Sequence, residues 1–265
     1  MQSTIHPTAV IGSSAVLAEG VTVGPYTVIE DDVEIGAGTV IAPHVYIASG
    51  ARIGSNCRIH AGAVLATAPQ DLKFAGEKTY LYVGDRTVVR ECVTLNRGTS
   101  ASGKTVIGSD NLFMAYVHVG HDCVIGNHVV VANGVPFGGH CEVGDHVVIG
   151  GLTGIHQFVR IGRNSMVGGV SRATLDVPPF VMASGNESFR YEGLNFIGLK
   201  RRGFTPEKIT LIKSAYRILF QSGLLLANAL EKVKTELPQD AEIVEILNFF
   251  ESGTHGRKFI RPFNS

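Results

Sequence analysis

The sequence predicts a mainly β protein, a parallel β-helix of hexapeptide repeats with a small all-α domain at its C-terminal end. Two observations support this prediction. An aliphatic residue recurs every six positions over residues 5–167, followed four positions later by a small or β-branched residue. Beyond Val177 this period gives way to segments with the spacing of amphipathic helices. A period of six that keeps its phase over such a length is typical of stacked hexapeptide coils.

The repeat starts at Ile5 and is interrupted twice, at residues 67–82 and 99–106, where we expect protruding loops. It resumes in phase after each interruption. The aliphatic positions are Ile5, Ile11, Leu17, Val23, Ile29, Ile35, Ile41, Ile47, Ile53, Ile59 and Leu65, then Val83, Val89 and Leu95, then Ile107, Phe113, Val119, Ile125, Val131, Phe137, Val143, Ile149, Ile155, Ile161 and Val167.

Each hexad supplies one short strand and one turn, so three hexads close a triangular coil of 18 residues. Residues 18 apart then stack at the ~4.8 Å spacing of neighbouring strands. Gly, Asn and Asp at the corners suit the turn geometry. We assign residues 1–190 to this β-helix, including an irregular exit segment after Val177.

Residues 191–265 form the expected helical domain. Thr205 is a good N-cap, Pro206 suits the first helical position, and Gly223 can end that helix. Two more amphipathic segments follow at residues 224–237 and 240–253. Because stacked repeats leave an open end, this domain is predicted to cover the last coil.

The composition narrows the possible functions. The formal net charge is zero and the pI is near 7.2, so no global attraction to nucleic acid or to an anionic membrane surface is expected. No apolar run approaches the roughly 20 residues of a spanning helix, and the first residues do not resemble a signal peptide. The four cysteines form no C-x-x-C pair. We therefore expect a cytoplasmic protein without membrane insertion.

One corner of the predicted β-helix gathers polar side chains. The 18-residue register stacks His121 with Gly139 and Gln157, and Asp122 with His140. A carboxylate beside an imidazole fixes its tautomer and stabilises the imidazolium, as a general base requires. The polar residues that converge on this corner are His121, Asp122, His140, His156 and Gln157.

Several motifs resemble the UDP-N-acetylglucosamine O-acyltransferase family, and the resemblance spans nearly the whole chain. They are "APQDLKFAGEKT", "VRECVTLNRGT", "HVGHDCVIG", "GIHQFVRIG", "MVGGVSRATLDVPPFV" and "GLKRRGFT". The resemblance implies left-handed coils and a homotrimer whose active sites lie between adjacent prisms. It also implies transfer of a (3R)-3-hydroxyacyl chain from acyl carrier protein to the glucosamine 3-position of UDP-N-acetylglucosamine. This is the first step of lipid A biosynthesis in Gram-negative bacteria, and no metal or cofactor is implied.

The same resemblance implies a role for particular residues. His121 would be the general base, Asp122 would orient it, and the Gly139 N–H would stabilise the oxyanion. Gly169 would set the acyl-chain length. The residues near the glucosamine would be Asp71, Lys73, His118 and His140. Those on the nucleotide and phosphate side would be His156, Gln157, Asn195, Arg201 and Arg202.

Two departures from the family pattern bear on the nucleotide contacts: Asn96 stands where histidine is common, and Ile197 where glutamate is common. Two other functional classes remain open. One is a trimeric β-helix zinc enzyme of the carbonic-anhydrase type, with His118, His121 and His140 as ligands. The other is a non-catalytic scaffold. The sequence also leaves open the acyl length and whether the acceptor is a 3-hydroxyl or a 3-amine.

Overall fold

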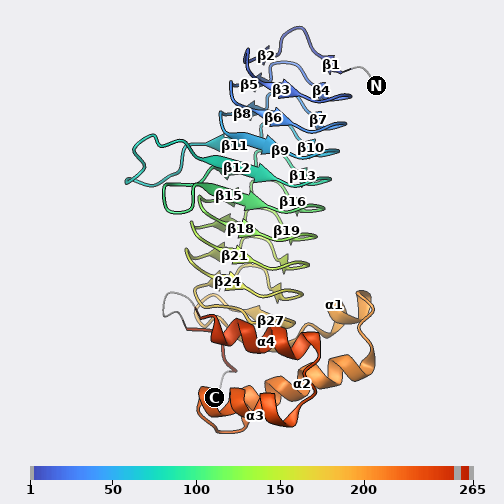
Figure 1. Ribbon diagram of the computed structural model, residues 1–265, viewed down its shortest axis with the longest axis vertical. Helices are drawn as coiled ribbons and strands as arrows, with labels where there is room; N and C mark the ends of the chain where they lie inside the picture. The colour runs from blue at the N-terminus through green and yellow to red at the C-terminus, as the bar shows by residue number, and fades with distance from the viewer. Residues whose placement is uncertain (1–2, 254–257, 263–265) are drawn as a thin grey trace.

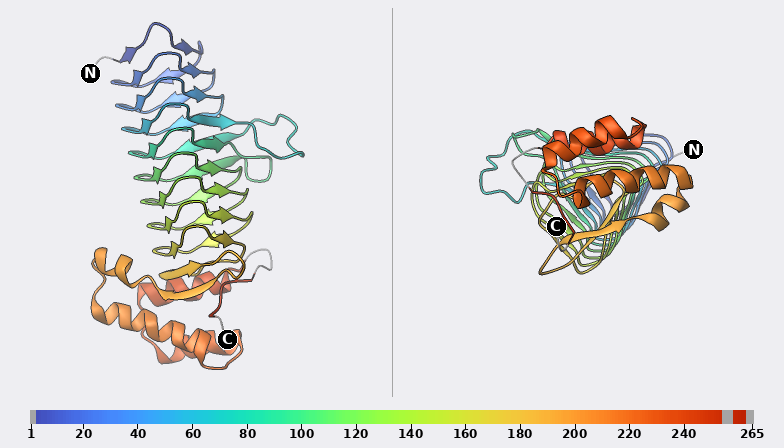
Figure 2. Two further views of the ribbon diagram at one scale, coloured as in Figure 1. Left: turned by 180° about the vertical axis from the view of Figure 1, so that it is seen from behind. Right: turned by 90° about the horizontal axis from the view of Figure 1, so that it is seen from below.

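The computed structural model describes residues 3–253 and 258–262. Figure 1 shows a tall stack of triangular coils, with the N-terminus at one end and the helices at the other. The end-on view in Figure 2 shows the triangular outline and the helices lying across the last coil. The helical region therefore covers one end of the β-helix, as the repeat pattern predicts.

Three sheets form the faces of the prism in the described part of the chain. The first contains β1 (Thr4–Ile5), β4 (Thr22–Val23), β7 (Val40–Ile41), β10 (Arg58–Ile59), β13 (Val88–Val89), β16 (Leu112–Phe113), β19 (Val130–Val131), β22 (Val148–Ile149), β25 (Met166–Val167), β27 (Val181–Ser184) and β28 (Arg190–Leu194). The second contains β2 (Val10–Ile11), β5 (Val28–Ile29), β8 (Tyr46–Ile47), β11 (Val64–Thr67), β14 (Thr94–Asn96), β17 (His118–Val119), β20 (Pro136–Phe137), β23 (Gly154–Ile155) and β26 (Arg172–Ala173). The third contains β3 (Val16–Leu17), β6 (Glu34–Ile35), β9 (Ala51–Ile53), β12 (Tyr80–Val83), β15 (Lys104–Ile107), β18 (Val124–Ile125), β21 (Glu142–Val143) and β24 (Arg160–Ile161).

Between strands of the hexad repeat, the 18-residue register holds wherever no loop intervenes, whereas β27, beyond the last hexad, pairs with β25 at a separation of 16 residues. β17 pairs in parallel with β20, so that His118 lies opposite Pro136 and Val119 opposite Phe137. Backbone hydrogen bonds join successive coils, and nearly all the repeating aliphatic side chains point inward and are buried. Cys123 and Cys141 are buried free thiols in this core. Burial of these inward columns supplies the main stabilising term of the fold.

Two loops project from the same side of the prism at successive coils (Figures 1 and 2). The long loop, residues 68–79, joins β11 to β12, and the strap, residues 97–103, joins β14 to β15. Val64 consequently pairs with Thr94, and Thr94 with His118. The separation between paired residues is 30 for Val64 and Thr94 and 24 for Thr94 and His118, against 18 for a plain coil. The loops therefore add two hexads and one hexad, and the columns continue in phase beyond each loop.

The exit segment is more regular than the sequence suggests. β27 extends the first sheet beyond the last hexad and pairs antiparallel with β28. A short helix then follows, α1 (Phe196–Arg201), in which Asn195 is the N-cap and accepts a hydrogen bond from Gly198 N at 3.2 Å. The expectation of an irregular exit segment after Val177 is therefore wrong for these stretches, because β27 and β28 continue the sheet and α1 is helical.

Three longer helices complete the cap: α2 (Pro206–Gln221), α3 (Leu226–Glu236) and α4 (Ala241–Glu251). Thr205 Oγ1 accepts from Lys208 N at 3.4 Å, so α2 begins where the N-cap pattern predicts. Arg160 fixes α4 to the last coil: its Nε donates to Asp176 Oδ2 at 2.9 Å, and its Nη2 to Phe249 O at 3.1 Å. Residues 1–2, 254–257 and 263–265, which belong to the two expected domains, lie outside the described residues.

Candidate active site

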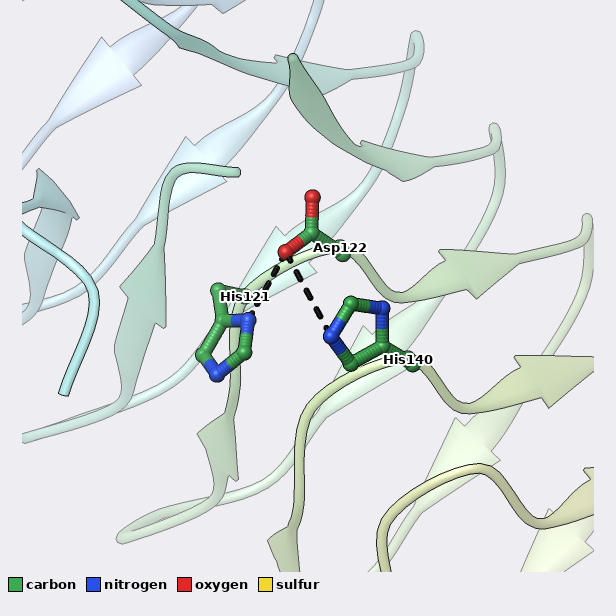
Figure 3. A group of neighbouring side chains, drawn as sticks. All are labelled: His121, Asp122 and His140. Carbon is green, nitrogen blue, oxygen red and sulfur yellow. Dashed lines mark hydrogen bonds and ion pairs between the residues drawn. The ribbon is translucent and has the colours of Figure 1, made fainter. Parts of the chain in front are cut away.

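An imidazole–carboxylate pair occupies the corner between β17 and β18. Nδ1 of His121 lies 2.8 Å from Oδ2 of Asp122 (Figure 3). The Asp122 side chain is fully buried, whereas 14% of the His121 side chain is exposed. The site thus pairs an inaccessible carboxylate with an imidazole that solvent or a ligand can reach.

The strap supplies the other partners of Asp122. Thr99 donates its backbone N–H to both carboxylate oxygens, at 3.1 and 3.2 Å, and its hydroxyl to Oδ2 at 2.7 Å. The Ser102 hydroxyl makes a short hydrogen bond to Oδ1. Burial raises the pKa of Asp122, but the hydrogen bonds from Ser102, Thr99 and His121 together outweigh it and lower the pKa to about 2. Asp122 is therefore an anion at neutral pH.

The ionised carboxylate determines the tautomer of His121. Because Asp122 can only accept hydrogen bonds, the proton of neutral His121 must be on Nδ1, which leaves a lone pair on Nε2. This is the arrangement that a general base needs.

Gly139 lies against the face of the His121 ring. A Cβ atom added at Gly139 would stand 2.6 Å from Cε1 and 2.7 Å from Nε2 of His121, so a side chain here would displace the ring. Among the described residues, the Gly139 N–H has no hydrogen-bond partner. The coil that follows His121 thus places a backbone without a side chain against the imidazole ring.

His140 stacks one coil beyond Asp122, and its Nε2 lies 3.8 Å from Asp122 Oδ2 (Figure 3). Its ring packs parallel on Phe158, with centroids 4.6 Å apart, and edge-on to His121 at 5.0 Å. Phe158 therefore holds the imidazole of His140 beside the His121–Asp122 pair.

His118 lies outside the immediate group. Its Nδ1 is 2.7 Å from Thr94 Oγ1, in the coil below. Burial, and to a lesser extent His121, lowers the pKa of His118. The side chain is therefore held neutral and oriented beside the candidate base.

A metal ligand set is the alternative use of this corner. In the part of the chain that the structure describes, ligand atoms of His121, Asp122 and His140 lie within 4.8 Å of one another. This set contains Asp122 in place of His118, so the ligand set of the zinc alternative is wrong in one member. The Asp122 oxygens also already accept from Thr99, Ser102 and His121. The geometry therefore fits a hydrogen-bonded dyad better than a metal centre.

The structure does not place all predicted site residues in contact with this pair. His156 and Gln157 are exposed on the next coil of the column, where His156 Nδ1 lies 3.0 Å from Gln157 O. Asp71 and Lys73 lie on the long loop, with Lys73 N donating to Asp71 Oδ1 at 3.0 Å. Within the described structure, no hydrogen bond or ion pair links these four residues to Asp122.

The other three residues expected on the nucleotide side belong to α1 and its ends. Asn195 is buried, and its Nδ2 donates to Asn164 O at 2.9 Å. Arg202 donates to His146 O at 2.9 Å, and burial lowers its pKa. Arg201 is exposed. Asn195 and Arg202 thus attach α1 to successive coils, a structural role that the motif match did not indicate.

Gly169 lies at a different corner from His121. Its nearest neighbour is Gly151 of the preceding coil, whose carbonyl oxygen would be 3.2 Å from an added Cβ. His121 instead packs on Gly139. Within one chain, therefore, the candidate base and the candidate chain-length residue do not face the same space.

Thr99 and Ser102 are functional candidates that sequence reasoning missed. Neither belongs to a hexad, so the period could not place them. A signal was nevertheless present: the strap leads directly into Lys104, which the 18-residue register places one coil before Asp122. A loop inserted under a candidate catalytic column is a natural source of partners for it.

Comparisons with known proteins agree with this fold and show the family of the chain. Residues 176–258 match the model of the UDP N-acetylglucosamine O-acyltransferase domain 2 family, and residues 32–67 and 104–135 match the bacterial transferase hexapeptide family. The chain is 76% identical to the acyl-[acyl-carrier-protein]–UDP-N-acetylglucosamine O-acyltransferase of Chlorobaculum parvum, covering 99% of this chain and 100% of that one. It is 77% identical to the protein of the same name from Chlorobium phaeobacteroides, with the same coverage.

Solved structures give the same result. The UDP-N-acetylglucosamine acyltransferase of Bacteroides fragilis matches with a TM-score of 0.93 and 42% identity, over 97% of this chain and 99% of that one. The corresponding structure from Moraxella catarrhalis matches with a TM-score of 0.94 and 42% identity over the same shares. The left-handed β-helix with a small helical region, expected from the resemblance, is thereby confirmed. Among the described helices, none is long and apolar enough to cross a membrane.

The low pKa of Asp122 makes stability depend on pH. Because the pKa is about 2 in the folded chain and about 4 in the unfolded chain, the ionised group stabilises the fold fully above about pH 4. This contribution, about 3 kcal/mol, is lost as the pH falls toward 2. Asp122→Asn should lack it. In urea unfolding, the free-energy gap between the two proteins should therefore narrow between about pH 5 and pH 2.5. A gap that stays constant would contradict the lowered pKa.

Proposed function

This chain belongs to the family of acyl-[acyl-carrier-protein]–UDP-N-acetylglucosamine O-acyltransferases, and we propose that His121 is the general base of its acyl transfer. The enzyme moves an acyl chain from acyl carrier protein to UDP-N-acetylglucosamine, the first step of lipid A synthesis. The observation that supports the role of His121 is the 2.8 Å contact between its Nδ1 and the buried, ionised Asp122, which leaves Nε2 free to take a proton.

The transfer then follows from this geometry. Nε2 of His121 takes the proton of the sugar 3-hydroxyl as its oxygen bonds to the thioester carbonyl carbon. The tetrahedral oxyanion is stabilised by the free N–H of Gly139. The C–S bond breaks as the carbonyl re-forms, and the proton on Nε2 passes to the leaving thiolate of the carrier protein. The negative charge of Asp122 stabilises the imidazolium between the two proton transfers.

The substrate contacts divide between two regions. We assign the glucosamine and neighbouring groups to His118 and His140, which flank the base, and to Asp71 and Lys73 on the long loop. The nucleotide and its phosphates are assigned to the exposed column residues and to the α1 region, where the guanidinium forks suit a diphosphate. These residues are His156, Gln157, Asn195, Arg201 and Arg202.

We further propose that the enzyme is a homotrimer with each active site between two chains. An exposed apolar ridge, which consists of Tyr116, Leu152 and Val170, runs along one corner of the prism. All three have positive φ, a strained conformation for such residues. Exposed apolar side chains along one corner favour contact with another chain. Gly169 immediately precedes Val170 on this ridge. If the ridge of one chain packs against the His121 corner of the next, Gly169 and His121 face the same space.

The reaction is assigned to the cytoplasm, consistent with four cysteines that are all free thiols. The carrier protein delivers the acyl chain, and Gly169 leaves space for its end. A zinc enzyme is not favoured, because the hydrogen bonds of Asp122 already use the oxygens that a metal would need. The family match likewise disfavours a non-catalytic scaffold.

Replacing His121 by Ala should lower kcat by at least ~100-fold, in line with the contribution of a general base. The assay combines UDP-N-acetylglucosamine with 3-hydroxyacyl carrier proteins of ten to sixteen carbons, with and without chelator. Circular dichroism and native mass should be unchanged in the variant, and chelator should not affect the wild type. Near-normal turnover by the variant would exclude His121 as the base, and loss of wild-type activity with chelator would support a metal.

Replacing Gly169 by Met should shift the preferred donor to shorter acyl chains. The backbone of Gly169 is compatible with a side chain, and an added Cβ needs only a small adjustment against Gly151 O at 3.2 Å. Gly169→Ala should give a smaller shift in the same direction. The same panel of acyl carrier proteins measures both variants, and an unaltered chain-length profile would remove Gly169 from this role.

A further inference from the structure

The strap is the one segment outside the hexad pattern that contacts the His121–Asp122 pair in the described part of the chain. We propose that Thr99 and Ser102 are positioning residues of the acyl transfer. They hold the Asp122 carboxylate against His121 and reduce the stabilisation that this carboxylate gives to the His121 imidazolium. This inference rests on the proposed role of His121 as general base. Neither hydroxyl contributes to the catalytic column that the hexad period predicts.

The hydrogen bonds of the strap are directed at both carboxylate oxygens. The Ser102 hydroxyl donates to Oδ1, the Thr99 hydroxyl donates to Oδ2, and the Thr99 N–H donates to both oxygens. Asp122 N in turn donates to Thr105 Oγ1 at 2.9 Å, just after the strap. The carboxylate therefore cannot rotate away from His121 without breaking several hydrogen bonds at once.

The strap also has internal and external supports that fix its shape. Ala101 N donates to Thr99 Oγ1 at 3.2 Å, and the Ser102 hydroxyl also contacts Lys104 O at 2.8 Å. Ser100 N donates to Glu77 Oε1 at 3.0 Å, on the long loop. The same short segment thus joins the carboxylate of the dyad to the loop that carries Asp71 and Lys73.

These donors affect the chemistry as well as the geometry. Each hydrogen bond to the carboxylate draws negative charge toward its donor, so less charge is left to stabilise the His121 imidazolium. The strap contributes two neutral hydroxyls and an amide, whereas its charged residue, Arg97, donates to Ser49 O and Ala66 O. The titratable neighbours of the pair include His118 on β17, His140 one coil later and the buried Cys123 thiol next to Asp122.

Removal of the hydroxyls therefore gives a specific signature. In Thr99→Val with Ser102→Ala, the Asp122 carboxylate keeps the Thr99 N–H, His121 and, at 3.8 Å, His140 as partners. More of its negative charge is then left to stabilise the His121 imidazolium. The acidic limb of the kcat/KM profile should move to higher pH, by roughly half a unit or more, given the strength of hydrogen bonds to charged groups. At neutral pH, kcat/KM should fall by about 10-fold, less than the loss in His121→Ala.

The experiment measures kcat/KM against pH for the wild type, the double variant and two controls. Thr99→Ser, which keeps a hydroxyl, should have the acidic limb of its kcat/KM profile at the same pH as the wild type. Ala101→Ser, at an exposed position of the strap, should not move this limb either. If the double variant does not fold, Ser102→Ala alone should give a smaller shift in the same direction.

A lower kcat/KM with an unmoved limb would show that the hydroxyls are merely structural, and wild-type kinetics would show that they do not matter. Either result overturns the inference. His121→Ala in the same assay separates the two proposals. If that variant stays active, the proposed base is wrong. If it loses activity while the strap variants behave as wild type, only the role of the strap is wrong.

Discussion

The backbone hydrogen bonds that hold successive coils in an 18-residue register are the constraint on which the whole site depends. They turn a one-dimensional period into columns, so residues far apart in sequence become neighbours. Gly139 lies on His121, and His140 lies beside Asp122, only because each strand pairs with the strand three positions later. Both loops add whole hexads, which keeps these columns aligned across the insertions.

The register also produces the strain that the corners carry. Asp122, His140 and Phe158 stack in one column, and all three have φ between 58° and 65°. Such a conformation costs a non-glycine residue roughly 1–2 kcal/mol, and the hydrogen bonds between coils offset it. Because the three residues share this conformation, their side chains project from the corner in the same direction. Phe158 therefore stacks on His140, and His140 lies close to Asp122. The repeated backbone conformation thus fixes the relative positions of chemically different side chains.

The fold and the centre of the site could be predicted from the sequence because both depend on periodicity. The coils, the loops and the pairing of His121 with Asp122 and Gly139 all follow from counting hexads and coils. Thr99 and Ser102 could not be found this way, since the strap has no repeat to place its side chains. The hairpin of β27 and β28 was missed for a related reason: it continues the sheet after the hexad signal has ended. Asp71 and Lys73 lie on the long loop, which likewise has no hexad repeat to place its side chains.

We propose that His121 and Asp122 act as one catalytic unit, and a double-mutant cycle measures the coupling between them. The quantity to measure is kcat/KM for the wild type, His121→Ala, Asp122→Asn and the double variant, with UDP-N-acetylglucosamine and one 3-hydroxyacyl carrier protein. If Asp122 acts through the imidazole, its replacement should cost almost nothing once His121 is absent, so the losses will be strongly non-additive. Losses that simply multiply would show that the two residues act independently, and would contradict a shared catalytic role.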